Sequence, residues 1–170
     1  MSKNISYITA EFLEEEKEKI ARWSKIAIKN SDLYKVLENG KVGGYVTDVL
    51  HLTLFYGLDE NRINIADIQK WISAVELENL EIEGVESFAL PTQEYKIIYL
   101  AIRDENGKIK KLNKELEKFP HFPRYLKSKF IPHITIASVK KEFDEDTVIY
   151  SGPKVLDVRK IVYHTKSKLS

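Results

Sequence analysis

Residues 51–54 read His-Leu-Thr-Leu and residues 133–136 read His-Ile-Thr-Ile, so one short pattern occurs twice in the chain. Each copy places a histidine and a threonine two positions apart, with an apolar residue after each of them. Successive residues of a β-strand point to opposite faces of the sheet. The pattern therefore predicts two strands, each with an imidazole and a hydroxyl on one face and two apolar side chains on the other.

The repetition is informative because both residue types are infrequent. The chain has 4 histidines and 7 threonines, so a threonine follows a given histidine two positions later with a probability of about 4%. Packing in the core is the simpler interpretation of one such motif, but it accounts poorly for two. We therefore take His51, Thr53, His133 and Thr135 as the candidate catalytic residues.

Predicted strands and helices alternate around the two motifs. Residues typical of strands occur at 5–10, 49–57, 81–90, 96–104, 132–139 and 155–165, with a shorter candidate at 147–150. Apolar residues recur at helical spacing over 12–29, 64–78 and 108–118. This order predicts a mixed α/β or α+β fold of two similar lobes, each with one histidine-bearing strand.

Composition restricts the class of protein. A chain of 170 residues with 43% hydrophobic residues suits one globular domain, 1–170. The net charge of +1 and the absence of a basic block argue against a long duplex nucleic acid as partner. The absence of cysteine excludes disulfides and suits a cytoplasmic protein. We expect no membrane segment, because the sequence contains no apolar run of 18 residues.

Metal and cofactor motifs are missing from the sequence. No HExxH pattern or carboxylate cluster accompanies the histidines, and residues 40–44 (GKVGG) lack the spacing of a phosphate-binding loop. We therefore expect neither a metal nor a cofactor.

The paired HLTL and HITI motifs, the proline before the second histidine in FIPHIT and the doubled lobe order resemble the two-histidine (2H) phosphoesterase superfamily. That superfamily includes RNA 2′,3′-cyclic phosphodiesterases, proteins named as 2′,5′ RNA ligases, and phage anti-CBASS nucleases that degrade cyclic oligonucleotide signals. The resemblance implies an α+β fold of two pseudo-symmetric lobes, with antiparallel sheets lining a V-shaped cleft and helices outside. It also places the catalytic positions at His51, Thr53, His133 and Thr135.

The segments HLTLFYGL and FIPHITIA are most similar to the anti-CBASS branch. This resemblance implies that the substrate is a cyclic dinucleotide or oligonucleotide. For a phage protein, it also implies a location in the host cytoplasm. Two alternatives stay open: an enzyme that processes RNA ends (a 2′,3′-cyclic phosphodiesterase or a 2′,5′ ligase), and a nucleotide-binding sponge without turnover. Relatives use aromatic residues near Tyr7 and Tyr163, so these two are candidates for stacking on a base, with core packing as the alternative. Arg124 and Lys129 precede the second motif and are either phosphate contacts or solvated surface.

Overall fold

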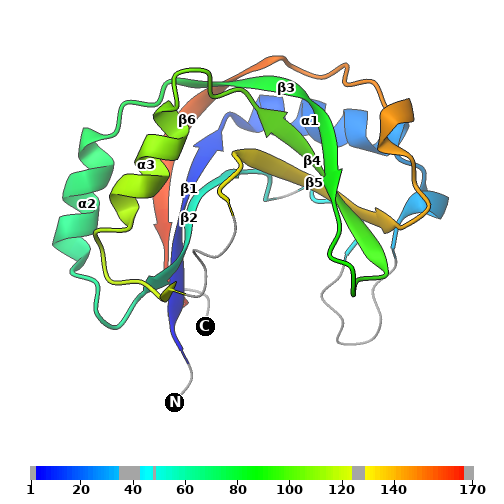
Figure 1. Cartoon of the computed structure of the whole chain (residues 1–170). Coiled ribbons are helices and arrows are strands. Elements are labelled where there is room, and N and C mark those ends of the chain that lie inside the picture. Colours follow the sequence, from blue (N-terminus) through cyan, green and yellow to red (C-terminus); the bar gives the residue numbers. More distant parts are fainter. Residues whose placement is uncertain (1–2, 35–42, 48, 124–128, 167–170) are drawn as a thin grey trace.

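The computed structural model describes residues 3–34, 43–47, 49–123 and 129–166. In this part of the chain the strands are β1 (Ile5–Phe12), β2 (Leu52–Asp59), β3 (Asn79–Phe88), β4 (Tyr95–Ile102), β5 (His133–Lys140) and β6 (Val155–His164). The helices are α1 (Glu14–Ala27), α2 (Ile65–Ala74) and α3 (Lys108–Leu116), with 3-10 turns at η1 (Asn30–Asp32) and η3 (Glu145–Thr147). Every strand pair is antiparallel, so the predicted α+β class is confirmed (Figure 1).

The strands form one sheet in the order β2-β1-β6-β3-β4-β5, which puts the two motif-bearing strands at its opposite edges. The ladder that joins the two halves is short, because β3 pairs with β6 only over residues 79–81 and 155–157. Figure 1 shows the sheet bending over like an arch, and β2 and β5 lie next to each other. The bend therefore brings the two sequence motifs together.

Short segments cover both edge strands. The segment 120–122 hydrogen-bonds to β2, and the segments 33–34 and 44–46 hydrogen-bond to β5. An open edge is a template for pairing with another chain, so this cover protects the strands that carry the motifs.

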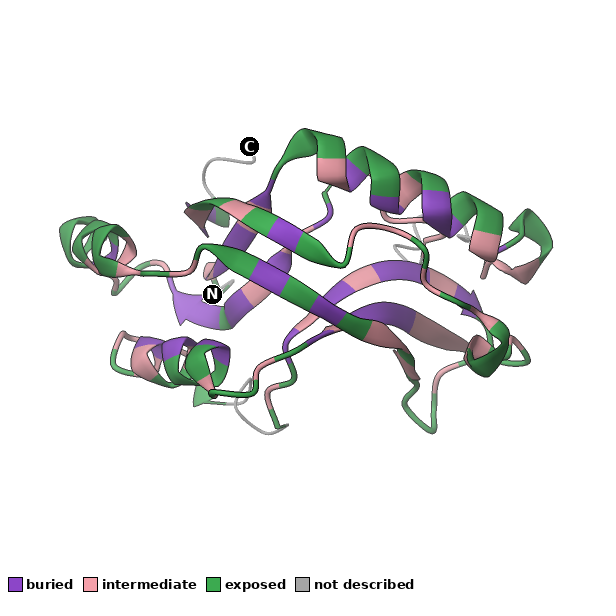
Figure 2. Cartoon of the chain, turned by 90° about the horizontal axis from the view of Figure 1, so that it is seen from above, coloured by how far each residue is buried: buried purple, intermediate pink, exposed green. Residues whose placement is uncertain are grey.

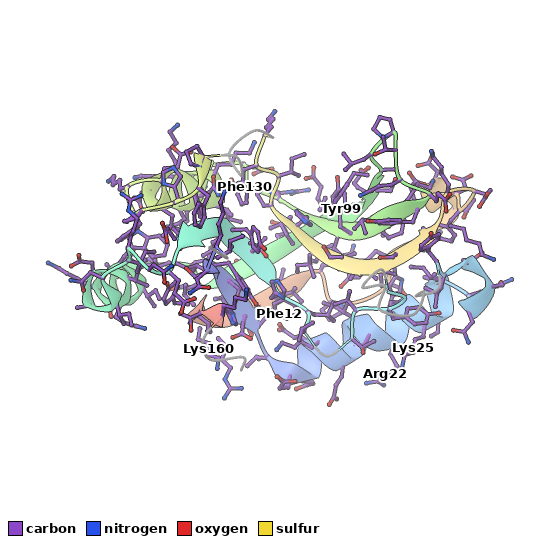
Figure 3. All side chains as sticks on the ribbon, turned by 90° about the horizontal axis from the view of Figure 1, so that it is seen from below. Phe12, Arg22, Lys25, Tyr99, Phe130 and Lys160 are labelled. Carbon is purple, nitrogen blue, oxygen red and sulfur yellow. The ribbon has the colours of Figure 1, made fainter. Side chains whose placement is uncertain are left out.

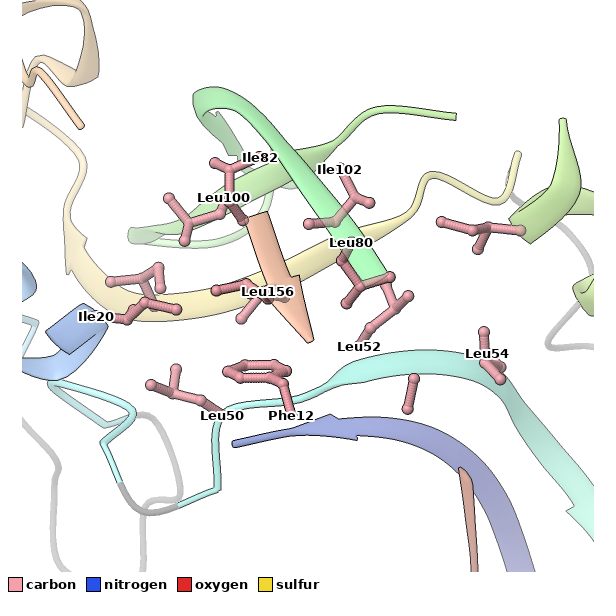
Figure 4. Packing of buried hydrophobic residues seen from close by; sticks show 14 of the residues in the cluster. Phe12, Ile20, Leu50, Leu52, Leu54, Leu80, Ile82, Leu100, Ile102 and Leu156 are labelled. Atoms are coloured by element: carbon pink, nitrogen blue, oxygen red, sulfur yellow. The ribbon is translucent and has the colours of Figure 1, made fainter. Parts of the chain in front are cut away.

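The apolar residues of the motifs anchor these strands in the core. Leu52, Leu54, Ile134 and Ile136 are each 0% exposed and belong to one hydrophobic cluster, part of which is shown in Figure 4. Burial of such a side chain stabilises a fold by about 1.5–3 kcal/mol. The histidines and threonines between them are only partly buried, which confirms the predicted alternation.

The outer side of the bend stays open to solvent. Figure 2 shows buried and exposed residues alternating along the first half of β3, the pattern of a strand with one solvated face. Within the described ranges, no helix is long and apolar enough to cross a membrane.

Local signals explain where the helices begin. The side chain of Asn64 accepts a hydrogen bond from the amide of Ala66 at 2.9 Å and caps α2. The helix ends at Ala74, before the predicted end at 78, because Val75 is extended and Leu77 packs against the core on the way into β3. Gly107, at φ +65°, precedes α3 in a left-handed conformation that glycine adopts without strain.

Two strand predictions need correction. The candidate strand at 147–150 is not formed, because Asp144 caps η3 there by accepting a hydrogen bond from the amide of Asp146, and Ile149 is 83% exposed. The strand predicted to carry the first motif begins at Leu52, so His51 lies just before it.

Candidate active site

His51 lies between Leu50 and Leu52, which are 1% and 0% exposed and hold the backbone in the core. Its Nδ1 atom is 2.5 Å from the carbonyl oxygen of Val49. A carbonyl oxygen only accepts hydrogen bonds, so Nδ1 carries a proton and donates it. The neutral ring therefore has its lone pair on Nε2, which lies 3.2 Å from Oγ1 of Thr53.

His133 repeats this arrangement at the first position of β5. Its Nδ1 atom lies 2.7 Å from the carbonyl oxygen of Ile131, again two positions earlier. The ring also contacts Tyr99 edge-on, with centroids 5.2 Å apart, and Phe88, at 6.1 Å. Both motif histidines thus keep the same tautomer, with the lone pair of the neutral ring on Nε2.

The threonines lie in register with neighbouring strands. Thr53 pairs with Thr9 of β1, and Thr135 pairs with Tyr99 of β4. Both are partly buried. Thr53 is hydrogen-bonded to His51, and Thr53 and His133 line the same cavity, so the bend of the sheet joins the two motifs.

Burial has the largest effect on the pKa of His51 and lowers it below the usual 6.5. The hydrogen bond to Val49 and the charge of Glu11 raise the pKa, whereas the charges of His133 and Lys17 lower it. The two motif histidines are therefore close enough for each to feel the charge of the other. Near neutral pH, His51 is uncharged and able to accept a proton.

A cavity of about 520 Å³ opens beside the motifs, within the size range of small-molecule sites. Thr53 and His133 contribute to its wall. Much of the remaining wall is aromatic and consists of Phe55, Tyr56, Phe88, Tyr99 and Phe130. Figure 3 shows Phe130 beside α3 and Tyr99 on β4. Such a wall suits stacking against a planar ring.

An irregularity in β2 decides which of the two aromatic residues after Thr53 is exposed. Thr9 pairs with Thr53 but Ile8 pairs with Phe55, so Leu54 is an extra residue in the ladder. Strict alternation would put Phe55 on the face of Thr53. Instead Phe55 is 2% exposed and Tyr56 is 49% exposed.

The two tyrosines predicted to bind substrate lie in different surroundings. Tyr7 is partly buried, stacks on His164 with centroids 4.6 Å apart, and lies 5.8 Å from the ring of Tyr56. Tyr163 is 8% exposed, belongs to the core cluster, and donates a hydrogen bond from its hydroxyl to Oγ of Ser6 at 2.8 Å. Only Tyr7 is retained as a candidate for substrate binding, because the packed ring of Tyr163 offers no face to a base.

The remaining predicted contacts and histidines are placed as follows. Lys129 lines the cavity, and Arg124 lies outside the described residues. Nδ1 of His121 is hydrogen-bonded to the carbonyl oxygen of Phe119, and its ring contacts Phe55. These contacts indicate a structural role for His121. Across the residues that the structure describes, no three His, Cys, Asp or Glu side chains are grouped to hold a metal ion.

Solved structures of low sequence identity share this fold. Escherichia coli LigT in its apo form is 14% identical with a TM-score of 0.62, and LigT complexed with 3′-AMP is 16% identical with a TM-score of 0.58. In both comparisons 96% of this chain and 88% of LigT are covered. Kluyveromyces marxianus Usb1 is 15% identical with a TM-score of 0.50, covering 83% of this chain and 73% of Usb1. At these identities the likeness shows the fold alone.

Sequence comparison identifies the family. No curated protein sequence matches the chain. The model of the 2′-5′ RNA ligase superfamily, however, matches residues 18–150, a range that contains both H-x-T motifs. The chain therefore belongs to the 2′-5′ RNA ligase superfamily, the 2H phosphoesterases, whose members are enzymes of phosphodiester chemistry.

Proposed function

We propose that this protein is a metal-independent phosphodiesterase that cleaves the 3′–5′ bonds of short or cyclic oligoribonucleotides. The observation that carries the proposal is the matched anchoring of His51 and His133, each of which donates from Nδ1 to the carbonyl two residues earlier. In-line displacement at phosphorus needs a base on one side and an acid on the other. Two imidazoles with Nε2 available supply both groups.

The roles of the histidines follow from the burial of His51. His51 stays neutral, so its Nε2 atom removes the proton from the ribose 2′-hydroxyl, whose oxygen attacks the adjacent phosphorus. The tethered hydroxyl acts at a high effective concentration. His133, protonated, gives its Nε2 proton to the departing 5′-oxygen. The products are a 2′,3′-cyclic phosphate and a 5′-hydroxyl.

A second step restores the starting protonation states. His133 is now neutral and removes a proton from water, whose oxygen attacks the cyclic phosphate. His51 returns its proton to the 2′-oxygen, and a 3′-phosphate remains. Thr53 and Thr135 donate hydrogen bonds to the non-bridging oxygens, where negative charge has to be stabilised.

More specifically, we propose that the substrate is a cyclic oligonucleotide immune signal. The resemblance of HLTLFYGL and FIPHITIA to the phage anti-CBASS nucleases supports this more specific proposal. A net charge of +1 and a cavity of about 520 Å³ favour a small substrate over a long RNA.

Processing of RNA ends is the second candidate function. LigT has been solved with 3′-AMP and Usb1 with uridine monophosphate, so two proteins of this fold accommodate a single nucleotide. Opening a 2′,3′-cyclic phosphate at an RNA end would use the second step above and the same four residues.

The deciding experiment is a substrate panel with EDTA present. Cyclic dinucleotides, linear diribonucleotides and RNA ending in a 2′,3′-cyclic phosphate are incubated with the protein, and the products are identified by mass spectrometry. Cleavage of the cyclic dinucleotides supports the favoured form, and turnover of only the RNA end supports the second. A requirement for a divalent ion overturns the metal-independent mechanism, and binding without turnover indicates a sponge.

A further inference from the structure

The cavity beside the motifs has polar lining residues that the proposed reaction does not use. Asn113 of α3 and Glu117, which follows the helix, contribute to its lining. Thr53 and His133 line the same cavity and are the residues assigned to the phosphate. In the proposed arrangement a nucleotide with its phosphate at Thr53 and His133 has its base among the aromatic residues, in the cavity that Asn113 and Glu117 also line.

The amide of Asn113 has a defined orientation. Its Nδ2 atom donates to the carbonyl oxygen of Leu54 at 2.7 Å. A carbonyl oxygen only accepts, so the nitrogen and oxygen of this amide are distinguished, and Oδ1 is left as an acceptor. Leu54 is the extra residue of β2 and has no partner in the ladder with β1. The carbonyl oxygen of this extra residue therefore holds the Asn113 amide in place.

Glu117 adds further acceptors. Its side chain is 30% exposed, and Oε2 lies 3.3 Å from Nζ of Lys114, whose side chain is 78% exposed. An ion pair with so exposed a partner contributes little and is readily exchanged for another contact. An ionised carboxylate has only acceptors, so Glu117 and Oδ1 of Asn113 favour a base edge that presents donors.

Guanine is the base that matches this requirement. Its Watson–Crick edge presents two adjacent donors, N1–H and the N2 amino group, which a carboxylate accepts together. Adenine and cytosine each present an amino group beside a ring nitrogen that is itself an acceptor, and uracil presents one donor between two carbonyl oxygens. We propose that Glu117, supported by Asn113, is a specificity-determining residue that selects a guanine base in this cavity, an inference that rests on the proposed function.

The test compares three cyclic mononucleotides that differ only in the base edge. Initial rates are measured for 2′,3′-cyclic GMP, IMP and AMP; inosine keeps N1–H and lacks the N2 amino group. We expect kcat/KM to fall in that order, with GMP favoured over AMP by about 10- to 100-fold, the size of a good bidentate base contact. Equal values for GMP and AMP would overturn the inference.

Two variants separate base recognition from a structural role. Glu117→Gln replaces one acceptor by a donor, so it should reduce the ratio of kcat/KM for GMP to that for AMP at least tenfold. Lys114→Gln removes the same ion pair but leaves the carboxylate, and should keep the preference. If both variants changed selectivity alike, or Glu117→Gln did not change it, the assignment would be wrong.

The affinity of the protein for the reaction products tests the inference even if none of the cyclic phosphates is turned over. In that case hydrolysis of the cyclic phosphate fails, but calorimetry with 3′-GMP and 3′-AMP still measures base selection. Tighter binding of 3′-GMP that Glu117→Gln removes would support the inference, and equal affinities would refute it.

Discussion

Nε2 of His51 and Oγ1 of Thr53 are hydrogen-bonded at 3.2 Å, and no corresponding bond joins His133 to Thr135 in the described part of the chain. Since Nδ1 of His51 already donates to Val49, Nε2 of the neutral ring accepts from the Thr53 hydroxyl. The hydroxyl therefore occupies the lone pair that takes up the substrate proton in the proposed mechanism. That mechanism requires substrate binding to turn this hydroxyl towards the phosphate, which frees His51 to act as base.

Removal of either imidazole should abolish most turnover. We expect His51→Ala and His133→Ala each to lower kcat by about 10² to 10⁴-fold, because each loses one proton transfer. Circular dichroism and the unfolding midpoint should stay close to wild type. His121→Ala is the matched control, since His121 is also anchored through Nδ1 to a carbonyl oxygen two positions earlier. Near-normal rates in both motif variants would contradict the catalytic assignment.

The threonines should matter less than the histidines. Thr53→Val and Thr135→Val each remove one donor to the phosphate, and we expect losses of about 10- to 100-fold in kcat/KM, the size of a hydrogen bond to a charged group. Thr53→Ser and Thr135→Ser retain the hydroxyl and should recover most of the rate. Complete loss in the Val variants, equal to that of the His variants and not recovered by Ser, would mean that the threonines hold the site together.

The rate of cleavage should have a bell-shaped pH profile, because one imidazole has to be neutral while the other is protonated. The acidic limb reports protonation of His51, whose pKa burial lowers from 6.5. Glu11→Gln removes a charge that favours the imidazolium, so it should move this limb to lower pH. Lys17→Met removes a charge that disfavours it and should move the limb to higher pH. Shifts in the same direction, or none, would contradict the assignment of His51 as base.

The sequence predicts which motif side chains are buried, because a strand has a period of two and each motif alternates polar and apolar residues. It does not predict the wall of the cavity. Phe88, Tyr99 and Phe130 come from the half of the sheet formed by β3, β4 and β5, whereas Phe55 and Tyr56 come from β2 in the other half. The two groups line one cavity because the bend brings β2 beside β5. The extra residue Leu54 likewise reverses the faces expected for Phe55 and Tyr56, and no local pattern signals it.

A partly buried ion pair should make stability depend on pH outside the active site. Burial raises the pKa of Glu145, but hydrogen bonds from Lys96 (2.8 Å) and Ser87 outweigh it and lower the pKa from 4.5 to about 2. The stabilisation is therefore complete above pH 4.5 and is lost as the pH falls towards 2. Glu145→Gln should reduce the free energy of unfolding at pH 7 by about 1 to 2 kcal/mol, an amount reduced by partial solvent exposure of the pair.

Urea denaturation at several pH values between 6 and 3 measures this effect. The wild type should lose stability towards low pH more steeply than Glu145→Gln does. Glu142→Gln changes an exposed carboxylate nearby and should behave like the wild type. Parallel curves for wild type and Glu145→Gln would show that the ion pair contributes nothing.

The 2′-hydroxyl should be the nucleophile of the first step. His51 is placed to remove a single proton, and a hydroxyl tethered beside the phosphorus needs no separate binding site, whereas a water molecule would. A cyclic dinucleotide with 3′–5′ bonds should therefore open through a 2′,3′-cyclic phosphate, which mass spectrometry detects at early times. The 2′-deoxy analogue should bind with similar affinity, because the threonine donors and the aromatic wall do not contact that hydroxyl in the proposed arrangement, yet it should remain uncut. Cleavage of the deoxy compound at a comparable rate would make water the nucleophile and would leave His51 as the base that activates it.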